Sequence, residues 1–282
     1  MYKEKFNEWL NSAVIAEEVK EELRSITDEK EIIANGFSLF PNKLSLSAYG
    51  TALKEPMAIL RAYGVTISLT IIGTACGLFI VAMTAYVLQR KDFMWRNKFS
   101  FYFYFTTLFN GGLVPWYILM VKYLGLKDTY LALLIPPMLS VFNIILMKSY
   151  IGGIPQALTE SAKIDGAGDF TIFVKIILPL IKPVGLLIAL GYWNDWYNSM
   201  LFINNENLYS LQYYLYKIVN NIEAYKTILA QNTSSVSGAI EMPSESLKMA
   251  LTVIVTGPII LVYPFIQKYF VSGVTIGAVK GW

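Results

Sequence analysis

The sequence contains no histidine and only one cysteine, Cys76. The lack of histidine removes the commonest general base and the commonest metal ligand. A single cysteine excludes a disulfide within the chain, a cysteine-rich metal site and a Cys/His nucleophile. We therefore expect no catalytic residues and no metal site. Because Cys76 lies in an apolar stretch, we predict that it is a small packing residue.

Charged residues are also scarce. They make up 15% of the 282 residues, whereas hydrophobic residues make up 55% and the mean hydropathy is +0.47; soluble domains are typically about 25% charged. The apolar residues gather in blocks near the roughly 20 residues that a helix needs to cross a bilayer. The composition thus predicts an all-α integral membrane protein. The five predicted membrane helices are 62–88, 101–120, 130–147, 184–203 and 249–266.

Lysine and arginine predict the orientation of these blocks, because cytoplasmic loops are rich in both. The loop 89–98 holds four of them and the segment 148–183 also holds four, whereas 204–248 holds only three lysines. We expect the first two segments and the C-terminus in the cytoplasm and 204–248 outside. Residues 1–61 then lie outside with no helix to carry them there, because 1–34 is charged and predicts a surface helix. Either a first membrane helix is missing, or the inserted form departs from this count of five spans.

A mixed segment, TESAKIDGAGDFTIFVKIILPLIKP (159–183), separates the third and fourth blocks. A short helix is predicted over 155–164, because proline is favoured at the first helical position and Gly166 suits a left-handed helix stop. Asp169 is expected to cap a second helix, which Pro179 then breaks or kinks.

Small and apolar side chains share one side of the short helix at helical spacing. Because this side is small in the middle, the surface of another protein could come close to it. From spacing alone, the simpler alternative is an amphipathic connector with a weak surface ion pair between Glu160 and Lys163. The residues on the predicted face are Ile154, Leu158, Ser161, Ala162 and Asp165.

The same segment resembles the signature loop of ABC importer permeases. The family pattern is Glu-Ala-Ala, three residues, Gly, nine residues, Ile-x-Leu-Pro. Here it is Glu160-Ser161-Ala162, Gly166 and Ile176-x-Leu178-Pro179, with every spacing kept and Ser161 in place of the first alanine. The segments ANGFSLFPNKLSLSAY, LFNGGLVPWYI, GYWNDWYNSMLFI, LQYYL and VYPFIQKYFVSGVTIGAVKG resemble the carbohydrate-uptake branch, which works with lipoprotein-anchored binding proteins for complex saccharides.

The resemblance implies a type I ABC importer transmembrane-domain fold, with a charged segment and outer loop over 1–61 and the transmembrane domain over 62–282. Family members have six membrane helices, the first of them where 1–24 stand here, and 183–193 is about one turn short. The resemblance therefore also implies a truncated or degenerate copy. The loop 155–179 would carry a coupling helix that docks on a separate cytoplasmic ATPase. Its coupling residues would be Thr159, Glu160, Ser161, Ala162, Asp165, Gly166 and Pro179.

The fourth block carries the polar and aromatic run WNDWYN, which suggests a substrate path. Asp195 is the only charged residue in the five blocks, and intramembrane acids usually face a protein interior or an aqueous cavity. Aromatic faces and amides also suit sugars. The alternative is an interfacial aromatic belt with structural polar contacts between helices. The candidate path residues are Asn110, Trp116, Asn143, Trp193, Asn194, Asp195, Trp196 and Asn198.

These features predict a permease subunit of a sugar or oligosaccharide importer in the bacterial plasma membrane, multi-pass and without its own cofactor. The chain has no Gly-x-x-x-x-Gly-Lys-Ser/Thr phosphate loop, so ATP and magnesium would bind to a partner ATPase dimer. A second permease and an external sugar-binding lipoprotein are the other expected partners. The outer segment 204–248 would contact the binding protein, or else be a solvated loop with one short helix near 209–221.

Two other functions compete with this prediction. One is a proton-coupled secondary transporter that uses Asp195 as a relay. The other is a membrane enzyme, which the lack of histidine and of paired buried carboxylates argues against.

Overall fold

The computed structural model describes residues 25–29, 31–32, 43–231 and 245–259. The predicted surface helix over 1–34 and the end of the predicted block 249–266 therefore lie largely outside the described residues. The chain divides into two compact units, which are treated one at a time. Unit 1 is Met1–Leu60 with Leu211–Val262, and unit 2 is Arg61–Ser210 with Tyr263–Trp282.

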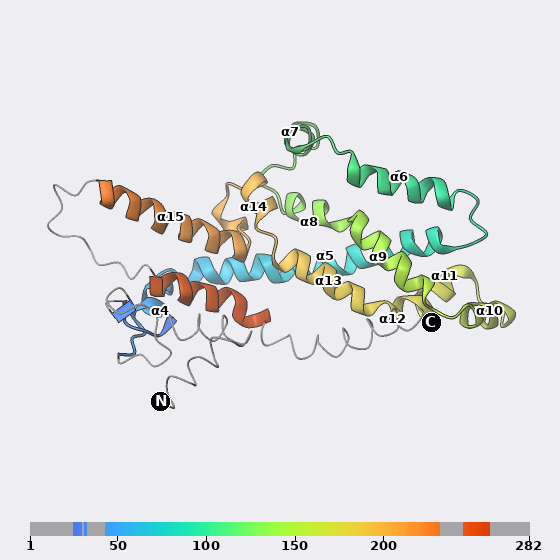
Figure 1. The fold of residues 1–282 in the computed structure, drawn as a ribbon, viewed down its shortest axis with the longest axis horizontal. Coiled ribbons are helices and arrows are strands. Elements are labelled where there is room, and N and C mark those ends of the chain that lie inside the picture. Colours follow the sequence, from blue (N-terminus) through green and yellow to red (C-terminus); the bar gives the residue numbers. More distant parts are fainter. Residues whose placement is uncertain (1–24, 30, 33–42, 232–244, 260–282) are drawn as a thin grey trace, which may run out of the picture. The chain divides into compact units, whose positions relative to one another are not determined.

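Helices make up the regular structure of both units, and the prediction of an all-α chain is confirmed over the described residues (Figure 1). The only β-pairing in that part of the chain is an isolated bridge between Thr27 and Leu44.

Unit 1 contains α4 (Ser47–Ala52), α15 (Leu211–Gln231) and a helix over 245–259. The Glu29 carboxylate accepts hydrogen bonds from the backbone N–H groups of Glu245 and Ser246, at 3.0 and 2.9 Å, and so caps the start of the last helix. The predicted short helix near 209–221 is in fact the 21-residue α15. It continues because 222–231 contains neither glycine nor proline to stop it.

The helix α5 (Pro56–Gln89) is the longest element, with 34 residues or about 51 Å, and contains the first predicted membrane block. Within the described residues it is the one helix long and apolar enough to cross a membrane, or one of three if each of two bent helix pairs counts as a single span. The later elements of unit 2 are α6 (Arg96–Leu108), α7 (Leu113–Ile118), a π-helical turn (Leu119–Tyr123), α8 (Tyr130–Met138), α9 (Val141–Gly152), α10 (Gln156–Ile164), α11 (Asp169–Ile172), a second π-turn (Phe173–Ile177), α12 (Leu178–Leu180), α13 (Lys182–Trp193), α14 (Tyr197–Phe202) and a 3-10 turn (Glu206–Leu208).

The second predicted block, 101–120, is not one continuous helix. It breaks between α6 and α7 at Asn110-Gly111-Gly112, where the Asn110 side-chain oxygen accepts the Gly112 N–H at 2.9 Å. Gly112 has φ +80°, a left-handed conformation that glycine adopts without strain. The local asparagine turn and the glycines therefore end α6.

Prolines and capping residues explain the two bent pairs. The axes of α8 and α9 differ by 44° just after Pro136 and Pro137, where Ser140 begins α9 by accepting the Asn143 N–H at 3.4 Å. The stretch Asp169–Leu180 meets α13 at 70°. This bend lies between Pro179 and Pro183, two residues without a backbone donor, so the predicted break at Pro179 is confirmed to within a few residues.

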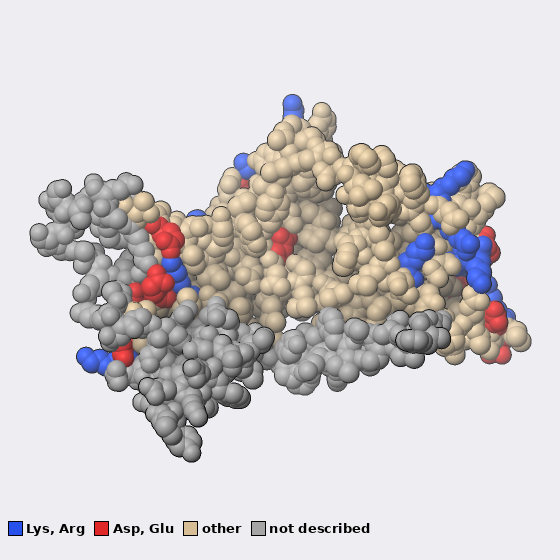
Figure 2. All heavy atoms as spheres, viewed as in Figure 1, with Lys and Arg blue, Asp and Glu red and all other residues tan. Residues whose placement is uncertain are grey.

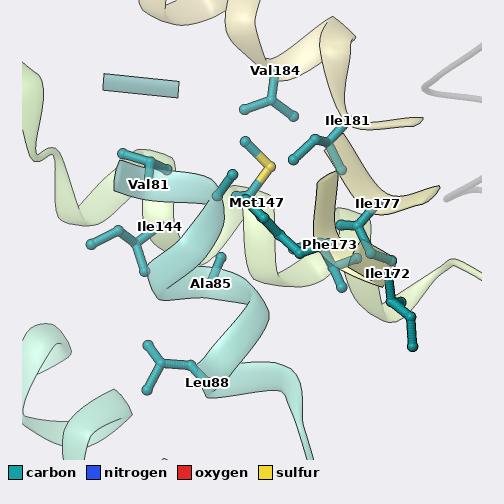
Figure 3. Packing of buried hydrophobic residues seen from close by; sticks show 12 residues of the cluster. Val81, Ala85, Leu88, Ile144, Met147, Ile172, Phe173, Ile177, Ile181 and Val184 are labelled. Atoms are coloured by element: carbon teal, nitrogen blue, oxygen red, sulfur yellow. The ribbon is translucent and has the colours of Figure 1, made fainter. Parts of the chain in front are cut away.

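A cluster of buried apolar side chains holds α5, α9, α11 and α13 together (Figure 3). Ala82 and Ala85 on α5 are fully buried, and their small side chains let Met147 of α9 and Phe173 pack closely. Phe173 also meets the rings of Phe79 and Tyr86, with centroids 5.9 and 5.6 Å apart. The members are Val81, Ala82, Ala85, Leu88, Ile144, Met147, Ile151, Ile172, Phe173, Ile177, Ile181 and Val184.

A second contact fixes the other end of α13. The buried Tyr192 lies flat against Gly73 of α5, and its hydroxyl donates to the Leu134 carbonyl of α8 at 2.7 Å. One side chain thus joins three helices.

The predicted packing role of Cys76 is wrong, because its side chain is exposed on α5.

Candidate functional site

The helix α10 has the boundaries that the sequence predicts, to within one residue. It runs from Gln156 to Ile164, with Pro155 as its N-cap rather than its first residue. Gly166 has φ +79°, and the N–H groups of Gly166 and Ala167 donate back to the carbonyls of Lys163 and Ala162 at 3.0 and 2.9 Å. This paired arrangement is a Schellman motif, so the predicted glycine stop is confirmed.

No residue of α10 is buried, and its exposed side carries apolar side chains. Ile164 is 86% and Leu158 46% exposed, and Ser161 and Asp165 lie on the surface with them. Ala162 is instead half-buried against the core cluster, and so is Ile154 before the helix. Three of the five residues of the predicted face are therefore exposed, whereas Ile154 and Ala162 pack against the core.

The charged residues around α10 pair differently from the prediction. Lys163 lies 3.9 Å from the Asp169 carboxylate and forms no ion pair with Glu160. Asp169 is not a cap either, since Gly168 is the N-cap and Asp169 the first residue of α11. Its carboxylate instead accepts Arg90, which follows α5, at 2.6 Å.

Arg90 joins two acidic side chains. Its guanidinium donates to Asp92, with Nε 2.9 Å from Oδ1, as well as to Asp169. These hydrogen bonds lower the pKa of Asp92 to about 2 and raise the pKa of Arg90. Arg90 therefore ties the start of α11, and with it the loop after α10, to the end of α5.

A polar cavity of about 560 Å³ lies among α8, α9, α13 and α14. Its polar side chains come from the start of α9 and from the loop between α13 and α14, because both helix pairs are interrupted there. We call it the polar cavity. Its lining contains five of the predicted path residues: Asn143, Asn194, Asp195, Trp196 and Asn198.

The Asp195 carboxylate is held by Asn198. Its two oxygens accept the Asn198 backbone N–H at 3.1 Å and the Asn198 side-chain amide at 2.7 Å. The Asp195 carbonyl accepts the Ser210 hydroxyl at 2.9 Å. Next to it, the rings of Trp196 and Tyr197 are perpendicular, 5.9 Å apart, and more than a third exposed. The cavity therefore offers aromatic surfaces beside amide and carboxylate groups.

Three predicted path residues do not line this cavity. Asn110 binds its own backbone in the break between α6 and α7, and Trp116 lies on α7. Trp193, one residue before the loop, has its indole N–H buried with no hydrogen-bond partner in the described part of the chain. Sequence reasoning also missed Tyr197 and Ser140, although WNDWYN contains the first and a serine after a Pro-Pro pair signals the second.

A second set of polar contacts lies near the start of α5, at the opposite end of that helix from Arg90. Arg61 donates to the Asn207 side chain at 2.8 Å, whereas Arg90 lies 29 residues further on, about 44 Å along a helix. Asp128, with φ 57°, accepts the Asn204 and Asn205 N–H groups, which lower its pKa. The segment 204–208 and α10 are thus separated by more than the roughly 30 Å hydrocarbon core of a bilayer.

A helical chain with one membrane-length helix, bent apolar helix pairs, a polar cavity among them and an exposed helix at one end has the features of a membrane transport subunit. The chain belongs to the family described as "Binding-protein-dependent transport system inner membrane component", whose model matches residues 79–276. It is therefore a bacterial membrane protein and a permease component, without an ATPase site of its own.

Relatives over most of the chain support this assignment. The chain is 39% identical to Protein LplC of Bacillus subtilis (strain 168) over 91% of this chain and 86% of that protein. It is 38% identical to the polygalacturonan/rhamnogalacturonan transport system permease protein YtcP of the same strain, over 91% and 89%. A solved bacterial ABC transporter involved in the import of the acidic polysaccharide alginate matches with a TM-score of 0.75 and 32% identity, over 90% of this chain and 89% of that one. The predicted type I importer fold is confirmed at this level.

Proposed function

We propose that this chain is the permease subunit of an ATP-driven importer of sugars or oligosaccharides. The observation that carries the proposal is the family match together with relatives that transport polygalacturonan/rhamnogalacturonan and alginate. The chain performs no covalent chemistry. It passes a saccharide through a bacterial cell membrane, while ATP and magnesium bind to a separate ATPase.

The helix α10 docks on that ATPase. It projects from the core with no buried residue and exposes Ile164 and Leu158 among polar side chains, which suits a protein contact better than a water-facing surface. Its attachment through the Schellman motif and the Arg90–Asp169 pair lets a push on α10 move α5 as a rigid body. The exposed and half-buried surface of the helix and its stop contains six of the predicted coupling residues: Thr159, Glu160, Ser161, Ala162, Asp165 and Gly166.

The polar cavity is this chain's part of the substrate path. Sugar hydroxyls match its amides, and Trp196 and Tyr197 offer ring faces for stacking. One chain has too few helices for a complete pathway, so a second permease supplies the rest. The outer segment 204–248 receives an external sugar-binding protein, and its first residues, 204–208, lie at the other end of α5 from α10.

The alternative of a proton-coupled transporter is not supported. The relatives belong to ABC systems, and both oxygens of the Asp195 carboxylate accept hydrogen bonds from Asn198, which fits a capping role for α14.

Gly166 and Gly168 offer a matched test of the docking role. Both are exposed, and a Cβ on either meets no atom within 4 Å, but only Gly166 has a positive φ. Gly166→Ala therefore strains the end of α10 by about 1–2 kcal/mol, whereas Gly168→Ala does not. In the assembled importer we expect Gly166→Ala to reduce ATPase activity stimulated by the sugar-loaded binding protein by roughly five- to thirtyfold. Equal activity of the two variants would contradict the docking role.

Trp196 and Trp116 offer a matched test of the substrate path. They are 38% and 37% exposed, but only Trp196 lines the polar cavity. Trp196→Ala removes about 1 kcal/mol of ring contact with the sugar, so we expect about fivefold slower uptake of labelled oligosaccharide with ATPase association unchanged. Trp116→Ala serves as the control. The assignment fails if the control slows uptake as much as Trp196→Ala does.

A further inference from the structure

A second cavity, of about 540 Å³, lies where α5 ends, between the α5–α6 loop, α9 and α10. Figure 2 shows lysine and arginine gathered over this end of unit 2, while the middle of the same view is almost free of charge. We call it the basic cavity. Its charged lining consists of five cations and two acids: Arg90, Lys91, Arg96, Lys148, Lys163, Asp92 and Glu160.

The charges of the basic cavity do not balance. Arg90 already pairs with Asp92, and Lys148 donates to the Ser100 hydroxyl at 2.9 Å. Lys91 and the half-buried Arg96 form no ion pair with any carboxylate in the part of the chain that the structure describes. Lys91 and Arg96 thus face a hollow whose lining holds more cations than acids, and a bound anion would lower the repulsion among those cations.

Exposed apolar side chains are close in the sequence to the cavity residues Asp92 and Arg96. Met94 is 82% exposed, Trp95 47% and Phe99 46%. The Lys98 ammonium lies 4.3 Å from the centroid of the Trp95 ring. Tryptophan and cations together are typical of the membrane–water interface. The loop also follows directly after α5, the helix long enough to cross the bilayer.

We infer that the basic cavity binds the phosphodiester headgroup of an anionic membrane phospholipid, with the acyl chains lying along Met94, Trp95 and Phe99. These exposed apolar side chains favour a lipid over free phosphate, because free phosphate has nothing to place beside them. Basic pockets between membrane helices on the cytoplasmic side are known to suit such headgroups. This inference rests on the proposed function for the cytoplasmic position of this end of the chain, whereas lipid retention is measured on the purified chain without the ATPase or the sugar.

The test measures lipid retention by the purified full-length chain in detergent. Native mass spectrometry compares phosphatidylglycerol with phosphatidylcholine for the wild type and for Lys91→Gln/Arg96→Gln. The control is Lys175→Gln/Lys182→Gln, which removes the same charge from exposed positions outside the cavity. Each lysine or arginine near an anionic headgroup contributes about fivefold in affinity, so we expect about thirtyfold weaker phosphatidylglycerol binding in the cavity variant. The control should bind as the wild type does.

Several results would overturn the inference. Equal losses in the two double variants would indicate general attraction by surface charge. Retention of phosphatidylcholine as tightly as phosphatidylglycerol would exclude headgroup selection. Displacement of the lipid by millimolar inorganic phosphate would assign the site to a soluble anion. Circular dichroism melts check folding, and Lys91→Gln alone, at an exposed position, should still weaken binding about fivefold if the double variant is unstable.

Discussion

The contact between Gly73 and Tyr192 gives the sharpest test of the packing in unit 2. A Cβ built on Gly73 would lie 2.6 Å or less from three carbon atoms of the Tyr192 ring. Ordinary carbon contacts begin near 3.4 Å and the nearest ring atom lies at 2.3 Å, so the ring in a Gly73→Ala variant must withdraw by about 1.1 Å. A movement of this size strains the 2.7 Å hydrogen bond from Tyr192 to the Leu134 carbonyl.

The expected cost follows from these two changes. Overpacking of a tight interface costs about 1–3 kcal/mol, and the weakened buried hydrogen bond adds about 1 kcal/mol. Alanine in place of glycine returns up to about 1 kcal/mol of helix propensity. We therefore expect Gly73→Ala to lower the free energy of unfolding by about 1–3 kcal/mol.

The assay is thermal unfolding of the purified full-length chain in detergent, followed by near-ultraviolet circular dichroism. Gly64→Ala on the same helix is the control, because a Cβ there meets no atom within 4 Å. In a Tyr192→Ala background the Gly73→Ala penalty should vanish, since the ring that it strikes is gone. The reasoning is refuted if Gly73→Ala melts like Gly64→Ala, or if the penalty persists without the ring.

Two further predictions concern acidic side chains at opposite ends of α5. The Asp128 side chain accepts both backbone hydrogen bonds through one oxygen, and its own backbone has φ 57°. We expect the melting temperature to fall in the order Asp128→Asn, which keeps these hydrogen bonds, Asp128→Gly, which loses them without strain, and Asp128→Ala, which loses them and strains the backbone. An alanine variant as stable as the asparagine variant would contradict this prediction. Arg90 lowers the pKa of Asp92 to about 2. The stability advantage of the wild type over Asp92→Asn should therefore be fully present above about pH 4 and be lost as the pH falls through 2. A difference that grows below pH 4 would reverse the sign and reject the pairing of Arg90 with Asp92.

The elements that sequence could predict are those set by local chemistry. The stop of α10 follows from Gly166, since few other residues adopt a left-handed conformation there, and the bend before α13 follows from two prolines. The break in the block 101–120 was missed because glycine and asparagine also occur inside continuous membrane helices. Only the observed turn at Asn110 distinguishes the two cases.

The features that sequence could not predict depend on which residues meet across the fold. Asp169 pairs with Arg90, 79 positions earlier, and no local pattern announces that contact. The orientation of α10 depends on where the core lies, which placed Ala162 inward and left Ile164 exposed. Trp193 and Trp196 are three positions apart in one motif, yet the end of α13 falls between them and only the second lines the polar cavity.

The ion pair and the apolar contacts that attach α10 can be compared by the free energy that each contributes. The Arg90–Asp169 pair is 24% and 50% exposed, and such pairs contribute about 0–1 kcal/mol. Ile154, Ala162 and Ala167 pack against the core cluster, and burial of an isoleucine side chain alone contributes about 1.5–3 kcal/mol when complete. The apolar contacts therefore hold α10 in place, and the weaker ion pair ties the start of α11 to the end of α5. Under the proposed docking role, a movement of α10 displaces the core cluster, which joins α5 and α11 to α9 and α13, two of the helices beside the polar cavity.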